Sequence, residues 1–264
     1  MMISIPKTAV IPAAGLGMRL RPATLAIPKE MFPIGRFPAI EWIIADAVRS
    51  GCENIIIITR QGKEIIEDYI SKHRSEISKY CEIKFILQPE PIGLGPAVTL
   101  VDDYIREDRF ALLLPDNMID AEKQPLNCLV THSAGKTSCI ISVMESYNVL
   151  ASRKSILGSA EIHKDYFKLT GIKHSESESA DYSPSNLLEI GRSVLSRDFI
   201  DAAKKLQKDQ ISDEITGGMV LNRLIAEGVE VNALKVAGKC FDISTLEGYI
   251  AAWQHFGTSE PLWQ

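Results

Sequence analysis

The chain has 264 residues, 45% of them hydrophobic and 24% charged, which is typical of a globular protein with one large core. Its formal net charge of -5 excludes the broad basic surface with which nucleic-acid-binding proteins attract phosphate backbones. The longest apolar runs, residues 55–58 and 111–114, are far shorter than the roughly 20 residues that span a membrane. We therefore expect neither a nucleic acid nor a membrane as a partner.

In the first half of the chain, short apolar strands alternate with amphipathic helices, which is the pattern of an α/β protein. The helix expected over residues 38–50 has an apolar stripe that stops at Gly51, a residue suited to end a helix. Because the strands are apolar throughout, we expect a mostly parallel sheet with helices on both faces. The expected strands are 8–13, 54–59, 82–88 and 110–114, and the expected helices are 38–50, 63–71 and 96–104.

The second half of the chain has a mixed pattern of strands and helices. Residues 173–185 are polar, rich in serine and without periodicity, and we expect a surface loop there. The expected strands are 138–144, 159–163, 167–172, 187–195 and 229–236, and the expected helices are 197–207, 216–227 and 245–255.

The remaining sequence features limit the location and the chemistry of the protein. Residues 1–7 lead directly into a strand pattern and lack the segments of a secretory signal, so we expect a cytoplasmic protein. The five cysteines are scattered, which favours reduced thiols in the core over disulfides or a zinc site. The histidines show no paired spacing that would mark a metal site on one helix face.

A glycine-rich turn follows the first expected strand, with the sequence AAGLGMRL at residues 13–20. Glycine lets backbone N–H groups approach an anion closely, and Arg19 adds a fixed fork of donors. Taken alone, the turn is equally compatible with a structural role. A dinucleotide-binding fold would need a third glycine in place of Leu20, and a P-loop would need Lys before Ser or Thr, so both classes are disfavoured.

A second segment, IPKEMFPI at residues 27–34, carries a single lysine, Lys29, between two prolines that stiffen the loop. The position of Lys29, close in sequence to the glycine turn, suits a phosphate contact. Considered without its context, Lys29 is equally compatible with a solvated surface lysine.

Together, residues 11–20 and 27–34 resemble the sugar-1-phosphate nucleotidylyltransferases, and most of all the bacterial UTP:glucose-1-phosphate uridylyltransferases. The resemblance covers nearly the whole chain. Further matching pieces occur in the order of that family: QPEPIGLG at 88–95, LLPD at 113–116, PSNL at 184–187 and FDI at 241–243.

The resemblance implies a nucleotide-diphospho-sugar transferase fold, which is an α/β, Rossmann-like fold with a mixed, mostly parallel sheet flanked by helices. It implies a single domain over residues 1–264. The nucleotide-binding half would be 1–135, and 136–264 would hold the sugar-phosphate-binding half and the C-terminal helices. It also implies UTP or dTTP and a sugar 1-phosphate as partners, Mg²⁺ as the cofactor, and a homo-oligomer.

The resemblance further implies roles for individual residues. Arg19, Lys29 and Asp116 would be catalytic, and Asp116 together with Asp242 would hold Mg²⁺. The sugar phosphate would lie near Gly158 and Lys173. The nucleotide would contact Ala13, Ala14, Gly15, Gly17, Gln88 and Gly93, the last two at its base.

These roles agree with the chemistry of nucleotidyl transfer. The attacking phosphate oxygen is already anionic, so the protein needs no general base and must align an in-line displacement and neutralise charge. Asp116 follows the apolar run 111–114, which places a carboxylate where open α/β sheets bind ligands. Without the resemblance, an ordinary turn aspartate is an equal alternative. For Gln88, the alternative is an amide that makes only local hydrogen bonds.

The chain departs from the family where the sugar should bind. The family's Glu-Lys-Pro sequence, which contacts sugar hydroxyls and the sugar-linked phosphate, is absent near residues 173–175. The sequence DEITGGM at 213–219 replaces the family's Gly-Glu-Ile-Gln-Leu-Thr-Asp.

Two hypotheses about the function follow from these departures. The first is an active nucleotidylyltransferase that uses glucose 1-phosphate or an altered sugar or cyclitol phosphate. The second is a catalytically weak regulatory paralogue that binds nucleotide or UDP-sugar and modulates an active uridylyltransferase. Retention of both aspartates favours the enzyme.

Overall fold

The first half of the chain forms four parallel strands, as its apolar runs predict. The computed structural model describes residues 6–132, 139–145, 149–150, 156–163, 165–173, 187–209 and 214–261. The four strands pair side by side, with β1 between β6 and β4 and with β5 at the edge. They are β1 (Thr8–Pro12), β4 (Asn54–Thr59), β5 (Glu82–Leu87) and β6 (Arg109–Leu113).

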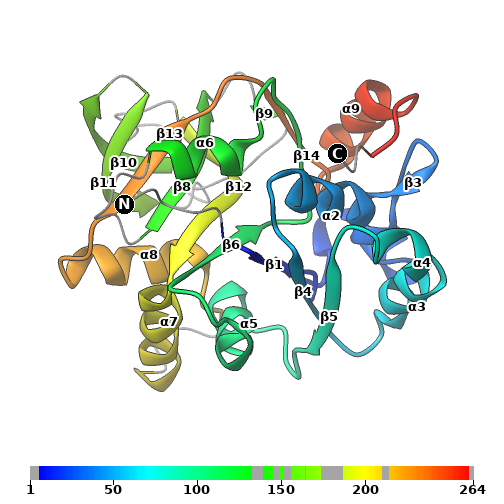
Figure 1. Ribbon diagram of the computed structural model, residues 1–264, viewed down its shortest axis with the longest axis horizontal. Helices are drawn as coiled ribbons and strands as arrows, with labels where there is room; N and C mark the ends of the chain where they lie inside the picture. Colours follow the sequence, from blue (N-terminus) through cyan, green and yellow to red (C-terminus); the bar gives the residue numbers. More distant parts are fainter. Residues whose placement is uncertain are drawn as a thin grey trace.

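Five strands from the second half extend the same sheet: β8 (Cys139–Glu145), β10 (Ile156–His163), β11 (Tyr166–Lys173), β12 (Leu187–Ser196) and β13 (Val231–Lys235). In the described chain the order is β10-β11-β13-β8-β12-β6-β1-β4-β5 (Figure 1). Strand β12 lies antiparallel between β8 and β6 and so joins the two halves. Only β11 and β12 run against the other seven strands, which confirms the predicted mixed, mostly parallel sheet.

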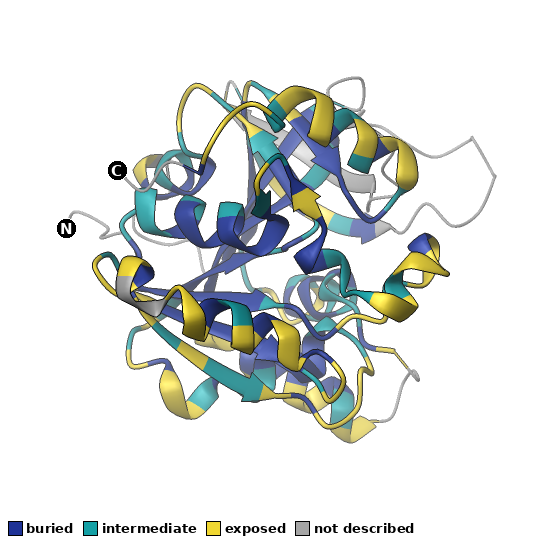
Figure 2. Cartoon of the chain, turned by 90° about the vertical axis from the view of Figure 1, so that its right-hand side faces the viewer, coloured by how far each residue is buried: buried dark blue, intermediate teal, exposed yellow. Residues whose placement is uncertain are grey.

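Helices cover both faces of this sheet. The side chains of β1 show the two layers, because Ala9 and Ile11 belong to one hydrophobic cluster and Val10 belongs to the other. The central strands β1, β4 and β6 are mostly buried, and the outer helix surfaces are exposed (Figure 2). One layer holds α2 (Ala39–Arg49), α3 (Glu64–Lys72), α4 (Arg74–Ile77), α6 (Pro125–His132) and α9 (Leu246–Phe256). The other holds α5 (Leu94–Thr99), α7 (Arg197–Asp209) and α8 (Gly217–Ala226).

Short elements account for most differences from the predicted pattern. The helix expected over 96–104 ends at Thr99, and a 3₁₀ turn, η3 (Asp102–Tyr104), follows it. Neither α6 nor the small sheet β7-β14-β9, whose strands are only two to four residues long, is among the predicted elements. These strands are β7 (Asn117–Asp120), β14 (Lys239–Asp242) and β9 (Val149–Leu150). Of the serine-rich segment, residues 174–185 lie outside the described chain.

The loops around the glycine turn contain further short elements: η1 (Met18–Leu20), α1 (Ala23–Ala26), η2 (Lys29–Met31), β2 (Pro33–Ile34) and β3 (Phe37–Pro38). All five cysteines are free thiols, and four of them are buried. Burial raises the pKa of the Cys52 thiol to about 12, so this thiol stays protonated in the core. Within the described residues, no helix combines the length and the apolar composition needed to cross a bilayer.

Candidate active site

The glycine turn leaves the carboxyl end of β1 and is held from two sides. The backbone N–H of Ala13 donates to the carbonyl oxygen of Ile58 at 2.7 Å. Gly17 has a φ of +65°, and its carbonyl accepts a hydrogen bond from the Thr24 hydroxyl at 2.7 Å. A Cβ atom placed on Gly15 would meet no atom within 4 Å. Gly15 therefore faces open space, as a residue that contacts a ligand through its backbone would.

A cavity of about 410 Å³ opens beside this turn. Ala13 lies behind it and is fully buried. The cavity brings together eight residues that the sequence predicts to bind substrate, and these residues come from four separate segments. They are Ala14, Gly15, Gly17, Arg19, Lys29, Gln88, Gly93 and Asp116. We call it the nucleotide cavity, after the role predicted for these residues.

A smaller cavity of about 200 Å³ adjoins the nucleotide cavity. Both cavities are lined by Arg19, Asp116 and Ser244, so these residues stand where the two meet. Asp242 lines the smaller cavity, whose wall continues along β12 and the start of α8. We call this second space the β12 cavity.

The two aspartates predicted to bind metal come from neighbouring strands of the small sheet. Asp242, the last residue of β14, stands opposite Asn117, the first residue of β7, and Asp116 immediately precedes β7. The N–H of Ile243 donates to the carbonyl oxygen of Asp116 at 2.9 Å. Asp242 is buried, and its Oδ1 accepts hydrogen bonds from the backbone N–H and the hydroxyl of Ser244. The fold thus places the two segments side by side, and both aspartates line the β12 cavity.

Two cations flank the carboxylates. Lys29 Nζ lies 2.7 Å from Asp116 Oδ2. Burial by itself lowers the pKa of Lys29, but the negative charges of Asp116 and Glu30 outweigh it, and the pKa stands above its ordinary value. Arg19 donates to the Ser244 hydroxyl at 3.1 Å and lies 3.8 Å from Asp242 Oδ2. The meeting point of the two cavities therefore carries two fixed positive and two negative charges.

Gln88 and Gly93 form one unit at the other end of the nucleotide cavity. Gln88 Nε2 donates to the carbonyl oxygen of Gly93 at 3.3 Å. Gly93 has a φ of +111°, and an added Cβ atom would lie 2.4 Å from the carbonyl oxygen of Ile215. Ile215 also exchanges backbone hydrogen bonds with Ile92 and Gly95, at 3.0 and 2.9 Å. The segment that precedes α8 therefore fixes the loop predicted to contact the base.

Residues 8–264 match the model of the nucleotidyl transferase family. The chain belongs to this family. The UTP–glucose-1-phosphate uridylyltransferases of Staphylococcus saprophyticus and Bacillus subtilis are each 30% identical to it over 96% of this chain. The matches cover 93% and 92% of those proteins.

Solved structures give the same result for the fold. A UDP-glucose pyrophosphorylase complexed with UDP-glucose superimposes with a TM-score of 0.82 at 26% identity, over 95% of this chain and 98% of the other. A UTP-bound UGPase from Acinetobacter baumannii gives a TM-score of 0.77 at 29% identity, over 97% and 95% of the two chains. The predicted family and fold class are confirmed, and the protein is a nucleotidyl transferase family enzyme.

This nucleotidyl transferase also contains a buried ion pair below the glycine turn that the sequence did not reveal. Lys63 Nζ donates to the carbonyl oxygen of Ala13 at 2.6 Å and to Glu30 Oε2 at 2.8 Å. Both side chains are almost fully buried, and desolvation lowers the pKa of Lys63 although Glu30 opposes this effect. The pair connects the glycine turn to the residue next to Lys29 and so fixes the two segments that are predicted to contact phosphate.

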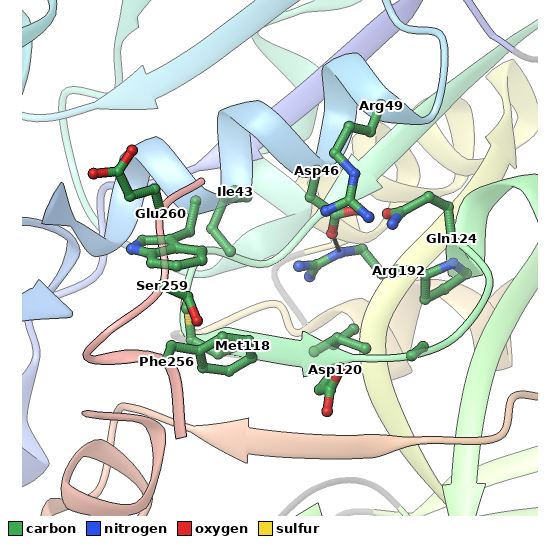
Figure 3. Close-up of a pocket in the computed structure, with 14 residues that line it drawn as sticks. Ile43, Asp46, Arg49, Met118, Asp120, Gln124, Arg192, Phe256, Ser259 and Glu260 are labelled. Atoms are coloured by element: carbon green, nitrogen blue, oxygen red, sulfur yellow. Dashed lines mark hydrogen bonds and ion pairs between the residues drawn. The ribbon is translucent and has the colours of Figure 1, made fainter. Parts of the chain in front are cut away.

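A second residue missed from the sequence, Arg192 on β12, holds the loop that carries Asp116. Its guanidinium donates to the carbonyl oxygens of Leu114 and Asn117 at 3.3 and 2.9 Å, on either side of Asp116. Its Nε donates to Asp46 Oδ2 at 2.6 Å, and Figure 3 shows this pair in a pocket outside the nucleotide and β12 cavities. A buried arginine has no distinctive spacing in the sequence, so only the three-dimensional fold reveals it.

The two residues predicted on the sugar side are placed only in part. Gly158 on β10 stands opposite Gly171 on β11, and Lys173 is the last residue of β11. The side chain of Lys173 lies outside the described part of the structure. Their contact with a sugar phosphate stays a prediction.

Alanine in place of Gly93 is expected to destabilise the transferase by about 1–3 kcal/mol, because the methyl group would meet the Ile215 carbonyl in a strained backbone conformation. Chemical denaturation measures this change. Gly15→Ala is the matched control, since a Cβ atom there meets nothing in the protein. It should leave stability within about 0.5 kcal/mol, yet weaken UTP binding. Equal stability of the two variants would contradict the expected clash at Gly93.

Asparagine in place of Asp46 is expected to cost about 1–3 kcal/mol of stability, because the buried Arg192 guanidinium loses its anionic acceptor. Chemical denaturation at several urea concentrations gives the free energy of unfolding. Asp68→Asn on the exposed side of α3 serves as control, and it should change stability by no more than about 0.5 kcal/mol. A stable Asp46→Asn variant would show that Arg192 does not need this partner.

Proposed function

We propose that this enzyme transfers a uridylyl group from UTP to a sugar 1-phosphate, which yields a UDP-sugar and pyrophosphate. The acceptor is glucose 1-phosphate or an altered sugar or cyclitol phosphate. The observation that carries the proposal is the charged cluster of Arg19, Lys29, Asp116 and Asp242 at the meeting point of two cavities. Two substrates that bind in the two cavities would bring their phosphates together at this cluster. Relatives named as UTP–glucose-1-phosphate uridylyltransferases support the choice of substrates.

The cluster suits a displacement at phosphorus. The sugar phosphate is already a nucleophile, so the protein has to align it with the α-phosphorus of UTP and offset negative charge in the transition state. Lys29, partly buried and with a raised pKa, keeps its positive charge at neutral pH. Arg19 is more exposed and presents several donors toward the same point. We assign charge neutralisation at the triphosphate to these two residues.

Asp116 and Asp242 are the residues that would hold Mg²⁺. Two hard carboxylate oxygens on adjacent strands, next to phosphates that complete the shell, form the donor set that Mg²⁺ favours in such enzymes. A bound Mg²⁺ would neutralise charge on the phosphates and help to orient them. In this structure Asp116 is paired with Lys29, so the lysine holds the carboxylate in place.

The choice of uracil rests on Gln88 and Gly93. A side-chain amide donates and accepts hydrogen bonds, which suits the edge of uracil and also of thymine. Gln88 is buried, and it lines the nucleotide cavity together with Gly93. The UTP-bound relative favours UTP over dTTP as the donor.

The decisive experiment is to measure pyrophosphate release with Mg²⁺, UTP or dTTP, and a panel of sugar 1-phosphates. We expect turnover with UTP and at least one sugar 1-phosphate. Tight binding of UTP or UDP-glucose by calorimetry without turnover of any panel member would overturn the proposal. That result would favour a catalytically weak protein that regulates an active uridylyltransferase.

A further inference from the structure

The β12 cavity contains a third carboxylate besides the two aspartates. Glu189 lines it together with Asn117 and Ser193. The rest of the lining consists of two glycines and of apolar side chains: Leu94, Leu112, Leu114, Leu195, Phe199 and Leu221.

The geometry of β12 directs Glu189 into this cavity. Alternate residues of a strand point to opposite faces, and Ser193 and Leu195 line the β12 cavity whereas Val194 packs into the cluster on the other face. Relative to β8, the register of β12 shifts between Glu189 and Ser193, which marks an irregularity of the bulge type. Four residues of β12 stand against two of β8 between these pairs, so Glu189 keeps the alternation of Ser193 and Leu195.

Gly191 makes this irregularity possible. It has a φ of +70°, and a Cβ atom there would lie 2.2 Å from Asn117 Nδ2 and 2.8 Å from Leu114 Cβ. The backbone of β12 therefore approaches the loop around Asp116 closely, and the carbonyl oxygen of Gly191 accepts from the Leu114 N–H at 2.9 Å. Glu189 is thus fixed on the same short stretch of chain that supports the charged cluster.

The charge of Glu189 decides what it can bind. A carboxylate accepts hydrogen bonds and donates none, and it repels phosphate. Of the cations that suit phosphates, Lys29 lines the nucleotide cavity and Arg19 stands where the two cavities meet. The group that meets Glu189 is therefore a hydrogen-bond donor on the sugar ring, which is either a hydroxyl or an ammonium group.

We propose that Glu189 determines which sugar 1-phosphate the enzyme accepts, by binding donor substituents of the sugar ring in the β12 cavity. This inference rests on the proposed function. It also supplies a carboxylate for the sugar in a chain that lacks Glu-Lys-Pro near Lys173. Glu189 acts on specificity, and the reacting phosphates belong to the charged cluster.

The test compares Glu189→Val and Glu189→Gln with the unaltered enzyme. The substrates are glucose 1-phosphate, its deoxy analogues at each ring hydroxyl and at the 6-position, and glucosamine 1-phosphate, with UTP and Mg²⁺. Both variants should lose about ten- to hundred-fold in kcat/KM for the best sugar, the range for a hydrogen bond to a charged group. The KM for UTP should stay unchanged. Glu67→Gln, an exposed glutamate on α3, is the control and should behave like the unaltered enzyme.

Substrate analogues identify the donor. If it is a hydroxyl, the unaltered enzyme loses activity on one deoxy analogue, and Glu189→Val shows no further loss on that analogue. If it is an ammonium group, the unaltered enzyme prefers glucosamine 1-phosphate, and Glu189→Gln abolishes this preference. Either pattern supports the proposal. The proposal is overturned if both variants keep kcat/KM within threefold of the unaltered enzyme for every sugar. It is also overturned if the loss of kcat/KM for a variant acting on an analogue equals the product of the two separate losses.

Failure of the proposed function has a different signature. In that case the unaltered enzyme turns over no sugar 1-phosphate. Calorimetry then compares UDP-glucose with UDP in the unaltered protein and in Glu189→Val. A sugar contribution to affinity that disappears in the variant still supports the role of Glu189, whereas an unchanged contribution overturns it.

Discussion

Replacing Asp116 by asparagine is expected to lower kcat for pyrophosphate release by about 10³-fold. Losses of this size are typical when an active site loses one preorganised group that stabilises charge in the transition state. Asparagine keeps the size of the side chain but removes the negative charge that pairs with Lys29 at 2.7 Å and that would hold Mg²⁺. UTP should still bind, because the glycine turn and Gln88 are unchanged. Steady-state kinetics at saturating substrate and UTP calorimetry measure the two effects.

The matched control for this variant is Asp120→Asn. Asp120 ends β7, the strand that follows Asp116, but it lies outside both cavities and pairs with His255 at 2.8 Å near the surface. Its replacement should leave kcat within twofold of the unaltered enzyme. If Asp116→Asn retained a tenth or more of the activity, Asp116 would not be the metal-binding catalytic group.

Replacing Glu30 by alanine is expected to destabilise the protein by about 3–5 kcal/mol, because it leaves the Lys63 ammonium buried without its anionic partner. The pair lies at the base of the glycine turn, so the damage should also weaken UTP binding. Denaturant unfolding gives the stability change, and calorimetry with UTP gives the change in affinity.

Two further variants separate a buried-charge effect from a general loss of packing. Glu30→Leu combined with Lys63→Met removes both charges and should recover most of the lost stability. Glu76→Gln breaks the exposed pair with Lys79 and should cost no more than about 1 kcal/mol. If the double variant were as unstable as Glu30→Ala, the cost would come from shape and not from charge.

The sequence predicts the large helices and strands because each of them buries one face, and apolar residues therefore recur at regular intervals along it. The strands β1, β4, β5 and β6 and the helices α2, α3, α7, α8 and α9 lie within one to three residues of the expected bounds. They carry enough apolar residues for the pattern to stand out. Strands of two to four residues give too few positions for any pattern, which is why β7, β9 and β14 were missed.

The candidate site, too, was predicted only in part. The glycines, Lys29 and Asp116 of the segments quoted above were all predicted to lie at one site, and the structure brings Lys29 and Asp116 together. Their roles stay predictions. Lys63, Glu30 and Arg192 were not found because a buried charge looks the same in a sequence as a solvated one. Glu189 was missed for a related reason: whether a strand residue lines a cavity depends on what packs against the strand, which a sequence does not reveal.

The ladder between β7 and β14 has a consequence for how the protein matures during synthesis. Asp242 reaches the side of Asp116 only when β14 has paired with β7, and the two strands are more than one hundred residues apart in the chain. A growing polypeptide on the ribosome can assemble β1, β4, β5 and β6 long before that pairing. Contacts between such distant residues form slowly. We expect a nascent chain to form the glycine turn early and to bring Asp242 beside the Asp116 segment only at the last stage of folding.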